Sequence, residues 1–593
     1  MNDIIERVES IRKWLDENDL DALIVPHEDE YLSEYIPPEN ERLLWITGFT
    51  GSAGIAIISK DSAAIFVDGR YTVQVRDQVD SDIYTILHLK DSPYLRWLNE
   101  NLRKGTRLGF DPRLHRANWL KYAEKAIGTK IKLITISNNP IDLLWVDRPS
   151  GNISDKALLL NDIYTGKSSW DKRKELGKFI SNNKCDAAFI TQLDSIAWLL
   201  NIRGNDVPCN PVLLCHGLLH SDGSFDIFID DNKIPDGFHD HVGENVTVIS
   251  PDKIYKSIAK HSGKTIQLDT TSSNLWSKNI ITDSGALMLE KKDPCTLPKA
   301  CKNAVEIQGM KNCHIRDAVA ECEFLSWLDD EINSGNFHDE GALADKLDGL
   351  RIKQQDCKGV SFGTISAAGK NAAMCHYSHK NHKVPGKLSM NSIYLVDSGG
   401  QYLDGTTDIT RTVAIGEPND FIKKTFTLVL KGHIALASAQ FPEGIAGQHL
   451  DTLARQYLWQ HGYDYDHGTG HGVGCYLNVH EGPHGIGKGA NNVSLTQGMV
   501  VSNEPGYYRE NEFGIRLENL IYVIYIKEID GNKLLGFENL TFVPFDTRLI
   551  DITLLTNSEI NWINSYHQEV LEKVGPYVEG SVLEWLNNSV RPI

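Results

Sequence analysis

The stretch that decides the fold is Ser392-Ile393-Tyr394-Leu395-Val396-Asp397, which returns as Asp404-Gly405-Thr406-Thr407-Asp408-Ile409-Thr410-Arg411-Thr412-Val413. The apolar run predicts a buried strand, and Asp404-Gly405 is typical of a hairpin turn. Two strands folded in this way can bring Asp397 and Asp408 to one place. Carboxylates that share a site repel each other unless a proton or a cation joins them. The pair therefore indicates a metal site, and the alternative is two unrelated turn aspartates.

Four histidines follow further along the chain, interleaved with glycine. They are His467, His471, His480 and His484. Glycine lets the backbone approach a ligand closely. A single buried histidine is usually structural, whereas so dense a group is typical of a ligand or catalytic site.

One stretch in this region matches a zinc-binding motif but contains residues that are incompatible with it. The stretch His480-Glu481-Gly482-Pro483-His484 matches H-E-x-x-H, the zincin pattern. That pattern works on a helix, where positions i and i+4 share a face. Gly482 and Pro483 would break such a helix, so zincin chemistry is not expected.

Two glutamates complete the set of candidate ligands. Glu504 directly follows an apolar strand, and Glu518 follows the segment Gly514-Ile515-Arg516-Leu517. A free charge at the edge of a core is expensive, and a salt bridge to Arg516 or to another neighbouring residue is the alternative for each. The combined candidate site is Asp397, Asp408, His471, Glu504 and Glu518. Four carboxylates suit two divalent ions with bridging ligands, first Mn²⁺, with Co²⁺, Fe²⁺ or Zn²⁺ as alternatives.

The rest of the chain indicates several domains, since 593 residues predict three or four at about 150 residues each. A helical pattern over 11–20 and a strand over 21–26 are repeated near 173–180 and 186–191. Strands at 64–68 and 226–230 also correspond, and generic α/β patterning is the alternative to a true repeat. Helical periodicity dominates 299–333, and glycine-broken strands after 359 indicate an antiparallel sheet with helices on one face. The predicted segments are 1–150, 151–298, 299–535 and a C-terminal extension, 536–593.

Composition limits the function. Lys and Arg number 60 against 79 Asp and Glu, a formal charge of −19, which argues against nucleic acid as a partner. The surplus acid is either solvated surface or carboxylates around metal ions. No stretch is long and apolar enough for a membrane span, the N-terminus is not that of a signal peptide, and the ten cysteines form no CxxC pair. These features predict a soluble, reduced, cytoplasmic protein with no membrane partner.

The five candidate ligands, in this order, resemble the dinuclear site of the pita-bread metallopeptidases, which include aminopeptidase P, prolidase and methionine aminopeptidase. Several stretches resemble aminopeptidase P in particular. They are Asp404-Gly405-Thr406-Thr407-Asp408, Gly470-His471-Gly472-Val473-Gly474, Asn478-Val479-His480-Glu481-Gly482-Pro483 and Asn503-Glu504-Pro505-Gly506-Tyr507-Tyr508. Trp45-Ile46-Thr47-Gly48-Phe49, Val67-Asp68-Gly69-Arg70-Tyr71 and Leu540-Thr541-Phe542-Val543-Pro544-Phe545 resemble the large, three-domain cytosolic form.

The resemblance implies a fold, an activity and a set of roles. The fold is α/β (α+β), with two creatinase-like domains before a pita-bread catalytic domain. The activity is release of an N-terminal residue when proline is second, by a hydroxide that bridges two metal ions and attacks the scissile carbonyl. The catalytic residues would be Glu504, His480 and His376. Glu504 would be both ligand and proton acceptor, and His480 would polarise the carbonyl and, with His376, stabilise the oxyanion. Both histidines would also bind substrate. His467 and His484 are supporting residues, and a homodimer is expected.

The resemblance implies that Arg70 helps to bind longer peptides. It looks like a family residue that reaches the active site of the partner subunit. The matching place in the second repeat holds Asp230-Asp231-Asn232, so the arginine is not needed to build the unit. An exposed turn arginine is the alternative.

Two other functions remain open at this point. A prolidase would cleave only Xaa-Pro dipeptides, although the long chain and the Trp45 and Arg70 stretches favour aminopeptidase P. A pita-bread binding module without activity would lack the metal ligands, whereas all five positions are filled here.

Overall fold

The chain forms two compact units in the computed structural model, which describes residues 2–151 and 155–593. The first unit contains the chain up to Asp162 and Lys167–Thr296; the second contains Ile163–Gly166 and Leu297–Ile593. Residue 1 of the predicted segment 1–150 and residues 152–154 of the segment 151–298 lie outside the described residues. The four predicted segment boundaries stay predictions.

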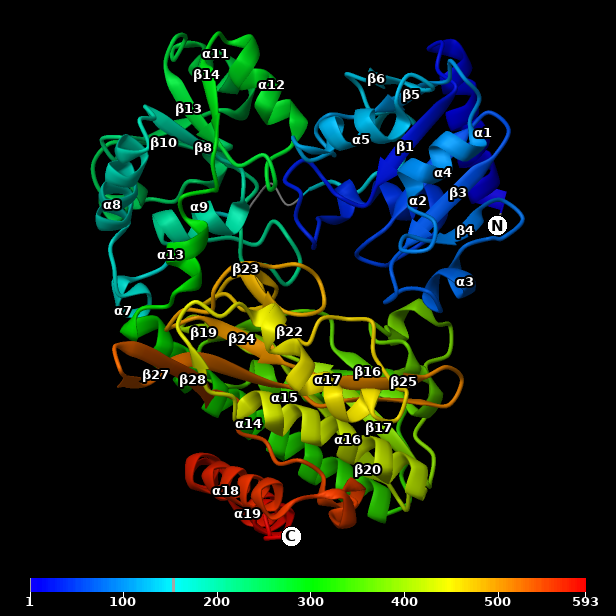
Figure 1. Cartoon of the computed structure of the whole chain (residues 1–593), viewed down its shortest axis with the longest axis vertical. Helices are drawn as coiled ribbons and strands as arrows, with labels where there is room; N and C mark the ends of the chain where they lie inside the picture. The colour runs from blue at the N-terminus through cyan, green and yellow to red at the C-terminus, as the bar shows by residue number, and fades with distance from the viewer. Residues whose placement is uncertain (1, 152–154) are drawn as a thin grey trace. The chain divides into compact units, whose positions relative to one another are not determined.

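The first unit contains two six-stranded sheets with the same topology (Figure 1). In order across the sheet, the first has β4 (Thr85–His88), β3 (Ala63–Val67), β2 (Ile55–Ser59), β1 (Ala22–Pro26), β5 (Arg107–Phe110) and β6 (Lys132–Thr135). The second has β12 (Val246–Ile249), β11 (Phe225–Phe228), β10 (His216–His220), β8 (Ala187–Ile190), β13 (Thr265–Leu268) and β14 (Leu287–Glu290). In the first sheet β3, β2 and β1 pair antiparallel, and in the second β11, β10 and β8 do the same. The other pairings in both sheets are parallel.

The helices of the first unit repeat as well. Helix α1 (Asn2–Glu17) leads into β1 and packs on β2, and α8 (Ser169–Asn182) leads into β8 and packs on β10. Strands β3 and β11, which the sequence matched to each other, take equivalent places in the two sheets. The predicted repeat is therefore confirmed.

The second unit combines long helices with antiparallel strands. Its longer helices are α14 (Ala304–Asn333), α15 (Glu340–Ile352), α16 (Asp420–Ala437), α17 (Asp451–Trp459), α18 (Asn557–Val574) and α19 (Gly580–Ser589), and the short helices α7 (Asp162–Thr165) and α13 (Thr296–Ala300) lie mostly in the same unit. Its first strands are β15 (Cys357–Val360), β16 (Ile365–Ala368), β17 (Ser392–Ser398), β18 (Gly400–Tyr402), β19 (Gly405–Thr406) and β20 (Ile409–Ile415). The later strands are β21 (Phe441–Pro442), β22 (Gly470–Gly472), β23 (Glu481–Ile486), β24 (Val500–Asn503), β25 (Gly506–Arg509), β26 (Phe513–Arg516), β27 (Asn519–Ile529) and β28 (Asn532–Asn539).

Two details differ from the sequence prediction. The helix expected over 299–333 begins at Ala304, because the Asn303 side chain accepts from the backbone of Val305 and Glu306 and so caps it. The antiparallel strands belong to several sheets rather than one, of which the order β16-β17-β20 and the order β21-β28-β27-β24-β22-β23 carry the candidate ligands. The general prediction of antiparallel strands with helices packed against them is confirmed.

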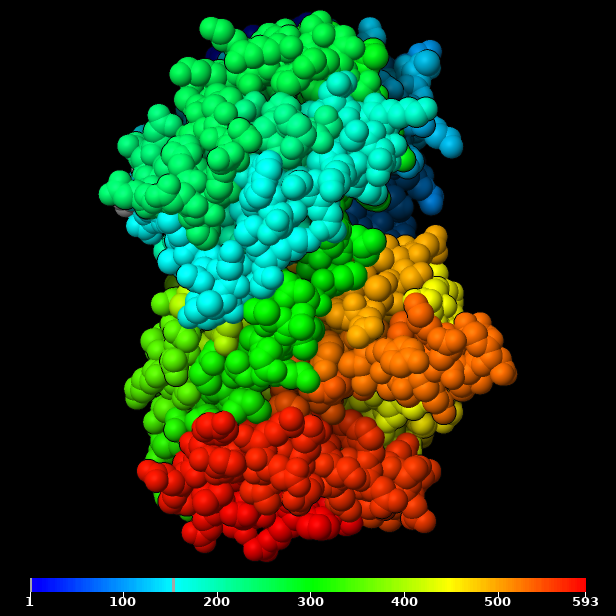
Figure 2. Space-filling view, turned by 90° about the vertical axis from the view of Figure 1, so that its left-hand side faces the viewer, coloured from blue at the N-terminus to red at the C-terminus, as the bar shows by residue number. Residues whose placement is uncertain are grey.

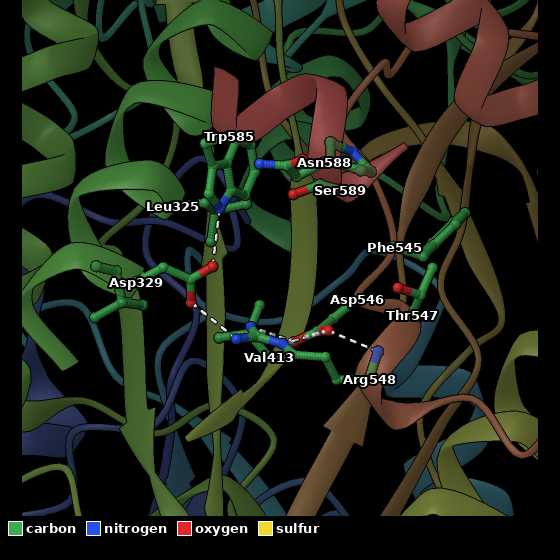
Figure 3. Close-up of a pocket in the computed structure, with 12 residues that line it drawn as sticks. Leu325, Asp329, Val413, Phe545, Asp546, Thr547, Arg548, Trp585, Asn588 and Ser589 are labelled. Atoms are coloured by element: carbon green, nitrogen blue, oxygen red, sulfur yellow. Dashed lines mark hydrogen bonds and ion pairs between the residues drawn. The ribbon is translucent and has the colours of Figure 1, made fainter. Parts of the chain in front are cut away.

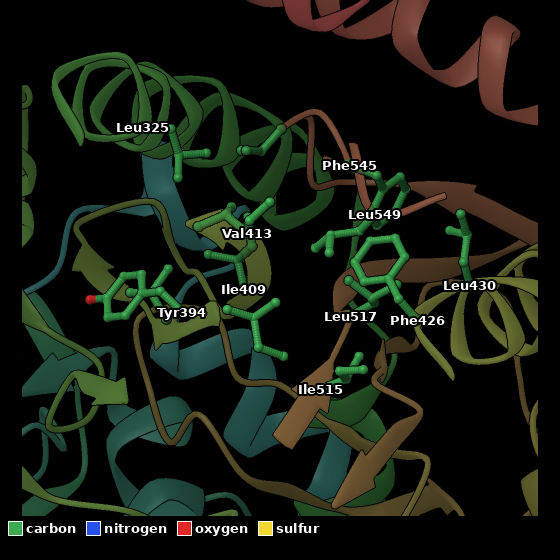
Figure 4. Close-up of a cluster of buried hydrophobic side chains, with 14 of the residues drawn as sticks. Leu325, Tyr394, Ile409, Val413, Phe426, Leu430, Ile515, Leu517, Phe545 and Leu549 are labelled. Carbon is green, nitrogen blue, oxygen red and sulfur yellow. The ribbon is translucent and has the colours of Figure 1, made fainter. Parts of the chain in front are cut away.

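Strand β20 separates a core from the candidate site. On one face Ile409 and Val413 lie in the main hydrophobic cluster, where Figure 4 shows them with Phe426, Leu517 and Phe545. Burying side chains of this size stabilises a fold by about 1.5–3 kcal/mol each. Because side chains alternate along a strand, Thr410 and Thr412 face the other way.

The C-terminal extension belongs to the same core. Ile563 and Val570 of α18 and Leu586 of α19 are fully buried in the main hydrophobic cluster. The red segment in Figure 2 is accordingly a continuous part of the surface of the second unit, and α18 and α19 pack against α14 (Figure 1). Within residues 2–151 and 155–593, no helix is long and apolar enough to cross a membrane.

A buried arginine ties the extension to the strands. Arg411 of β20 is fully buried and donates to the carbonyl oxygens of Val543 (2.7 Å) and Glu518 (2.7 Å) and to the hydroxyl of Tyr566 (3.1 Å). That hydroxyl donates in turn to Val543 O (2.9 Å). One guanidinium therefore joins β20, the backbone of Glu518 and helix α18.

Removing the Tyr566 hydroxyl should weaken this connection. We expect Tyr566→Phe to destabilise the second unit by about 1–2 kcal/mol, since a buried donor to a carbonyl and an acceptor from a charged group are lost together. Thermal unfolding would measure this as a lower midpoint. Tyr577→Phe, which changes an exposed tyrosine of the same extension, is the control and should unfold like the native chain. Equal midpoints for all three proteins would contradict the prediction.

Candidate metal centre

Strand pairing places the two aspartates of the decisive stretch together. β17 pairs antiparallel with β20, and Asp397 lies opposite Thr410. Asp408 precedes Thr410 by two residues, so both side chains point to the same face as Asp397. Both carboxylates are buried, and the charge of Asp408 acts on Asp397.

The two glutamates reach the same place from other strands. The backbone of Glu518 forms an isolated antiparallel β-bridge with that of Thr410. Its carboxylate accepts a hydrogen bond from the Thr410 hydroxyl at 2.8 Å. Glu504 follows β24 and accepts from the Ser502 hydroxyl at 3.1 Å. The Ser502 hydroxyl also accepts from the backbone N–H of His471, at 2.9 Å. Each glutamate is thus oriented by a hydroxyl: Glu518 by Thr410 of β20, and Glu504 by Ser502 of β24, the strand that it follows.

The orientation of His471 prepares its Nε2 atom as a ligand. Its Nδ1 lies 3.0 Å from the carbonyl oxygen of Gly472, an acceptor, so Nδ1 carries the proton. A ligating imidazole typically makes such a hydrogen bond with its second nitrogen. Nε2 faces Asp408 Oδ2 at 3.5 Å and Glu504 Oε1 at 3.4 Å. Without a cation, a proton on Nε2 joins the imidazole to these two oxygens. Once that proton is lost, Nε2 and the two oxygens can bind a cation together.

Two buried oxygens of the cluster accept no hydrogen bond within the described part of the chain. They are Asp397 Oδ1 and Glu518 Oε1. An unsatisfied buried carboxylate oxygen is costly. One ligand atom each from Asp408, His471 and Glu518 lies within 4.8 Å of the others. Donor type, spacing and the unsatisfied oxygens all fit divalent cations with oxygen and imidazole ligands.

Burial dominates the electrostatics of these side chains. It raises the pKa of Asp397 to about 7, although Arg516 acts in the opposite direction. Burial, and then the charges of Asp408 and Glu504, raise the pKa of Glu518 well above its usual value. Burial lowers the pKa of His471, but Asp408 and Glu504 outweigh this and raise it to about 9. The protein side chains alone therefore retain protons that a cation would displace.

Arg516 has a different partner from the one considered in the sequence. Its guanidinium forms a buried ion pair with Asp397, not with a glutamate. It also donates to the Tyr508 hydroxyl at 2.8 Å, and that hydroxyl lies 2.8 Å from His467 Nε2. His467 Nδ1 donates to Gly468 O at 2.7 Å, so Nε2 is the acceptor from Tyr508. His467 is thereby held next to the cluster, with Nδ1 3.9 Å from Glu504 Oε2.

The other predicted histidines lie in different environments. The ring of His480 meets that of His471 edge to face, with centroids 4.3 Å apart, and its charge acts on Glu504. His484 is buried, binds Val500 O at 2.7 Å, and has its pKa lowered to about 4 by burial. These contacts leave His484 a structural role in β23. Because residues 481–486 form a strand rather than a helix, the H-E-x-x-H pattern cannot place two histidines on one helical face.

His376 and Arg70 are the remaining predicted site residues. His376 is half-buried in the loop between β16 and β17, and its neighbour Cys375 acts electrostatically on Tyr508, so this loop adjoins the cluster. Arg70 belongs to the first unit, where it pairs with Asp68 at 2.7 Å and lies over the Tyr71 ring at 5.2 Å. Its reach toward a substrate stays a prediction.

A separate pocket in the second unit contains none of these side chains. Its volume is about 220 Å³, and it lies between α14, β20 and α19 (Figure 3). Asp329 accepts there from Trp585 Nε1 at 2.8 Å and from Arg548 at 3.1 Å. Arg548 also pairs with Asp546 at 2.7 Å, and this pocket is not the candidate centre.

Known proteins match every part of the chain. Residues 308–524 match the metallopeptidase family M24, and 533–593 match the C-terminal region of peptidase M24. Residues 7–144 and 147–306 each match a creatinase/prolidase N-terminal domain. A probable Xaa-Pro aminopeptidase P of Talaromyces marneffei is 40% identical, over 100% of this chain and 92% of its own length. One from Tuber melanosporum is also 40% identical, over 100% and 99%.

A solved structure extends this match to three dimensions. It is the X-prolyl aminopeptidase of Caenorhabditis elegans, described as a cytosolic enzyme with a di-nuclear active site. The two chains are 35% identical and cover each other completely, with a TM-score of 0.95. The chain belongs to the Xaa-Pro aminopeptidase P family. It is a metallo-exopeptidase with two creatinase-type N-terminal domains and an M24 pita-bread catalytic domain. Membership in this family confirms the predicted fold class.

Sequence reasoning missed several side chains that contact the candidate ligands. Ser502 and Thr410 each stand two residues from a candidate ligand on the same strand face, so strand alternation was a usable signal for both. Tyr508 and the pairing of Arg516 with Asp397 had no such signal. Asp397 and Arg516 are 119 residues apart, and only the fold brings them together.

Metal binding should depend on pH in a defined direction. Asp397 and His471, with raised pKa values of about 7 and about 9, stabilise the metal-free fold at low pH and lose that contribution as the pH rises through these values. Mn²⁺ must displace their protons, so we expect release of about 1.5 protons per chain from these two groups at pH 7, about one from His471 and about half of one from Asp397. The rise in unfolding temperature on adding Mn²⁺ should be larger at pH 8 than at pH 6.

Calorimetric titration of Mn²⁺ in two buffers of different ionisation enthalpy would measure the protons released. Thermal unfolding of the metal-free and Mn²⁺-loaded chain at both pH values would measure the stabilisation. No proton release, or equal stabilisation at pH 6 and pH 8, would contradict the prediction.

Proposed function

We propose that this chain removes the N-terminal residue from peptides with proline in the second position, using two divalent cations held by Asp397, Asp408, His471, Glu504 and Glu518. The observation that carries the proposal is the convergence of these five side chains, three buried and two partly buried, with two carboxylate oxygens that accept no hydrogen bond in the described chain. Similarity to Xaa-Pro aminopeptidases over the whole chain supports the same substrate class.

The ligand set supports hard or intermediate divalent ions. Bound cations would lower the pKa of a water molecule and polarise a carbonyl oxygen. Four carboxylates against one imidazole favour Mn²⁺, with Zn²⁺ or Co²⁺ as alternatives.

Glu504 is the proposed acceptor of the proton from the attacking water and its later donor to the proline nitrogen. Burial raises the pKa of this carboxyl, which makes it a stronger base than an exposed glutamate. The hydroxyl of Ser502 holds Oε1 at 3.1 Å, and Oε2 lies near His467. These contacts fix the direction in which the carboxylate can receive a proton.

His480 is the proposed hydrogen-bond donor to the oxyanion, with His376 as a substrate-binding residue. His480 contacts the ring of His471, so it stands beside the proposed ligands without being one of them. A donor aimed at a developing oxyanion typically contributes about 3–4 kcal/mol to the transition state. The free amine of the substrate would bind near the acidic cluster, which would restrict cleavage to the N-terminal bond.

Other properties are proposed from the resemblance. The family resemblance supports a homodimer and a cytoplasmic location, and the similar C. elegans enzyme is described as cytosolic. The resemblance also supports a contact between Arg70 and longer peptides. A dipeptide-only activity is the competing function, although the full-length similarity to Xaa-Pro aminopeptidases favours the longer substrates.

The central test is Glu504→Gln. The amide keeps the volume of the carboxylate but cannot take the proton, so we expect turnover on an Xaa-Pro-Xaa peptide to fall at least about 100-fold. Circular dichroism should report an unchanged fold, and elemental analysis should measure the metal that remains bound. Glu510→Gln, which changes an exposed glutamate in the turn between β25 and β26, is the control. A metal-loaded Glu504→Gln protein with near-native turnover would refute the assignment.

A second test separates long from short substrates. Arg70→Ala should reduce kcat/KM for an Xaa-Pro-Xaa tripeptide by about tenfold, while an Xaa-Pro dipeptide should lose less than about twofold. The reason is that only the longer peptide would extend to this side chain. Arg76→Ala, in α3 (Gln74–Gln78) of the same domain, is the matched control. Equal losses on both substrates would make Arg70 a structural residue.

A further inference from the structure

A buried carboxylate on α15 organises the loop that carries His376. Glu340 is the first residue of that helix and is fully buried. Both of its oxygens accept two hydrogen bonds. The donors are Ala368 N (2.7 Å) and Asn371 Nδ2 (2.9 Å) on Oε1, and the Tyr377 hydroxyl (2.6 Å) and Gly386 N (2.6 Å) on Oε2. Four donors on one buried carboxylate are an unusually complete set, and hydrogen bonds to a charged acceptor are the strong ones.

These donors lie at both ends and in the middle of the loop. Ala368 is the last residue of β16, and Gly386 lies shortly before β17. The backbone N–H of Glu340 also donates to Gly386 O at 2.9 Å. At Gly386 a side chain would not fit, because a Cβ would lie 2.7 Å from Glu340 Oε1. One side chain therefore closes the loop and fixes Tyr377 within it.

The loop cannot supply this acceptor itself. No aspartate or glutamate stands between Asp356 and Asp397, a stretch that contains five lysines. The Tyr377 ring stacks on His382 at 5.2 Å, so the hydroxyl bound to Glu340 orients both ring and backbone. The neighbouring residue in the chain is His376.

The same loop rests on a strand of the candidate centre. Its 3₁₀ turn, Gly369–Ala373, packs on β26, where a Cβ on Gly514 would lie 1.8 Å from Ala372 O. β26 ends with Arg516, the partner of Asp397. The segment that contains His376 thus runs from a support on β26 to an anchor on α15.

We propose that Glu340 is a positioning residue for His376, and that it acts through the Tyr377 hydroxyl to hold the histidine at the substrate. The inference rests on the proposed role of His376 in substrate binding. Misplacement of such a group by about 1 Å can reduce a rate by about 100-fold. In Glu340→Gln, the amide NH₂ would face two of the hydrogen-bond donors that the carboxylate now binds. Tyr377→Phe would remove the hydroxyl donor to Glu340 and keep the packing of the aromatic ring.

A double-mutant cycle tests whether the effect passes through His376. We expect Tyr377→Phe to lower kcat/KM on an Xaa-Pro-Xaa tripeptide about fivefold in the native chain, but less than about twofold in a His376→Ala background, because coupled residues are not additive. Glu340→Gln should behave in the same way with a larger loss. Mn²⁺ content should not change in any variant, since no proposed ligand is altered. If Glu340→Gln fails to fold, the Tyr377→Phe cycle still decides.

Tyr394→Phe is the matched control. Tyr394 is a fully buried tyrosine whose hydroxyl binds Ser366 at 2.7 Å rather than Glu340, and its removal should leave kcat/KM unchanged. Equal fold losses from Tyr377→Phe in both backgrounds would mean a purely structural role and would overturn the inference alone. An unchanged kcat/KM for His376→Ala would overturn the role of His376 in the proposed function, and this inference with it.

Discussion

Four carboxylates and an imidazole share one buried place in the second unit, and their mutual repulsion is the constraint on which the rest of the structure depends. Burial raises the pKa values of Asp397, Glu504 and Glu518. Without a cation, the charged forms of these carboxylates are therefore unfavourable. Such a site persists only because the surrounding fold fixes every member of it. Strands satisfy this need better than loops, and each ligand lies in a strand or directly beside one. Asp397 is in β17 and His471 in β22, whereas Asp408 precedes β20, Glu504 follows β24 and Glu518 precedes β27.

The strand that carries the site also carries the core. Along β20 the odd-numbered residues Ile409 and Val413 lie in the hydrophobic cluster, while Thr410 orients Glu518 on the other face. The apolar face provides the stability that offsets the acidic face. Arg411 extends this arrangement to the C-terminal helices, because it binds the backbone of Glu518 and the hydroxyl of Tyr566. The extension is therefore part of the scaffold of the site.

The sequence predicted the local parts of this arrangement and not the distant ones. The repeat in the first unit and the pairing of β17 with β20 follow from apolar runs and a hairpin signal, which act over short distances along the chain. The candidate ligands were visible because ligand chemistry restricts residue type. The contact of Arg516 with Asp397, or of Glu340 with Tyr377, depends on which remote segments meet. No periodicity or spacing encodes that, so these contacts were found only in the structure.

Part of the formal charge of −19 comes from the acidic cluster in the second unit. Arginines surround the acidic cluster, yet in the described chain only Arg516 pairs with a proposed ligand carboxylate, Asp397; Arg411 binds the backbone of Glu518 rather than its side chain. In the described chain no second guanidinium binds Asp397 Oδ1 or Glu518 Oε1. The cationic side chains of the protein therefore neutralise the acidic cluster only in part. The unbalanced charge is what allows divalent ions to compete with protons for the site. A more stable apo-protein, with every carboxylate paired, would bind metal less well.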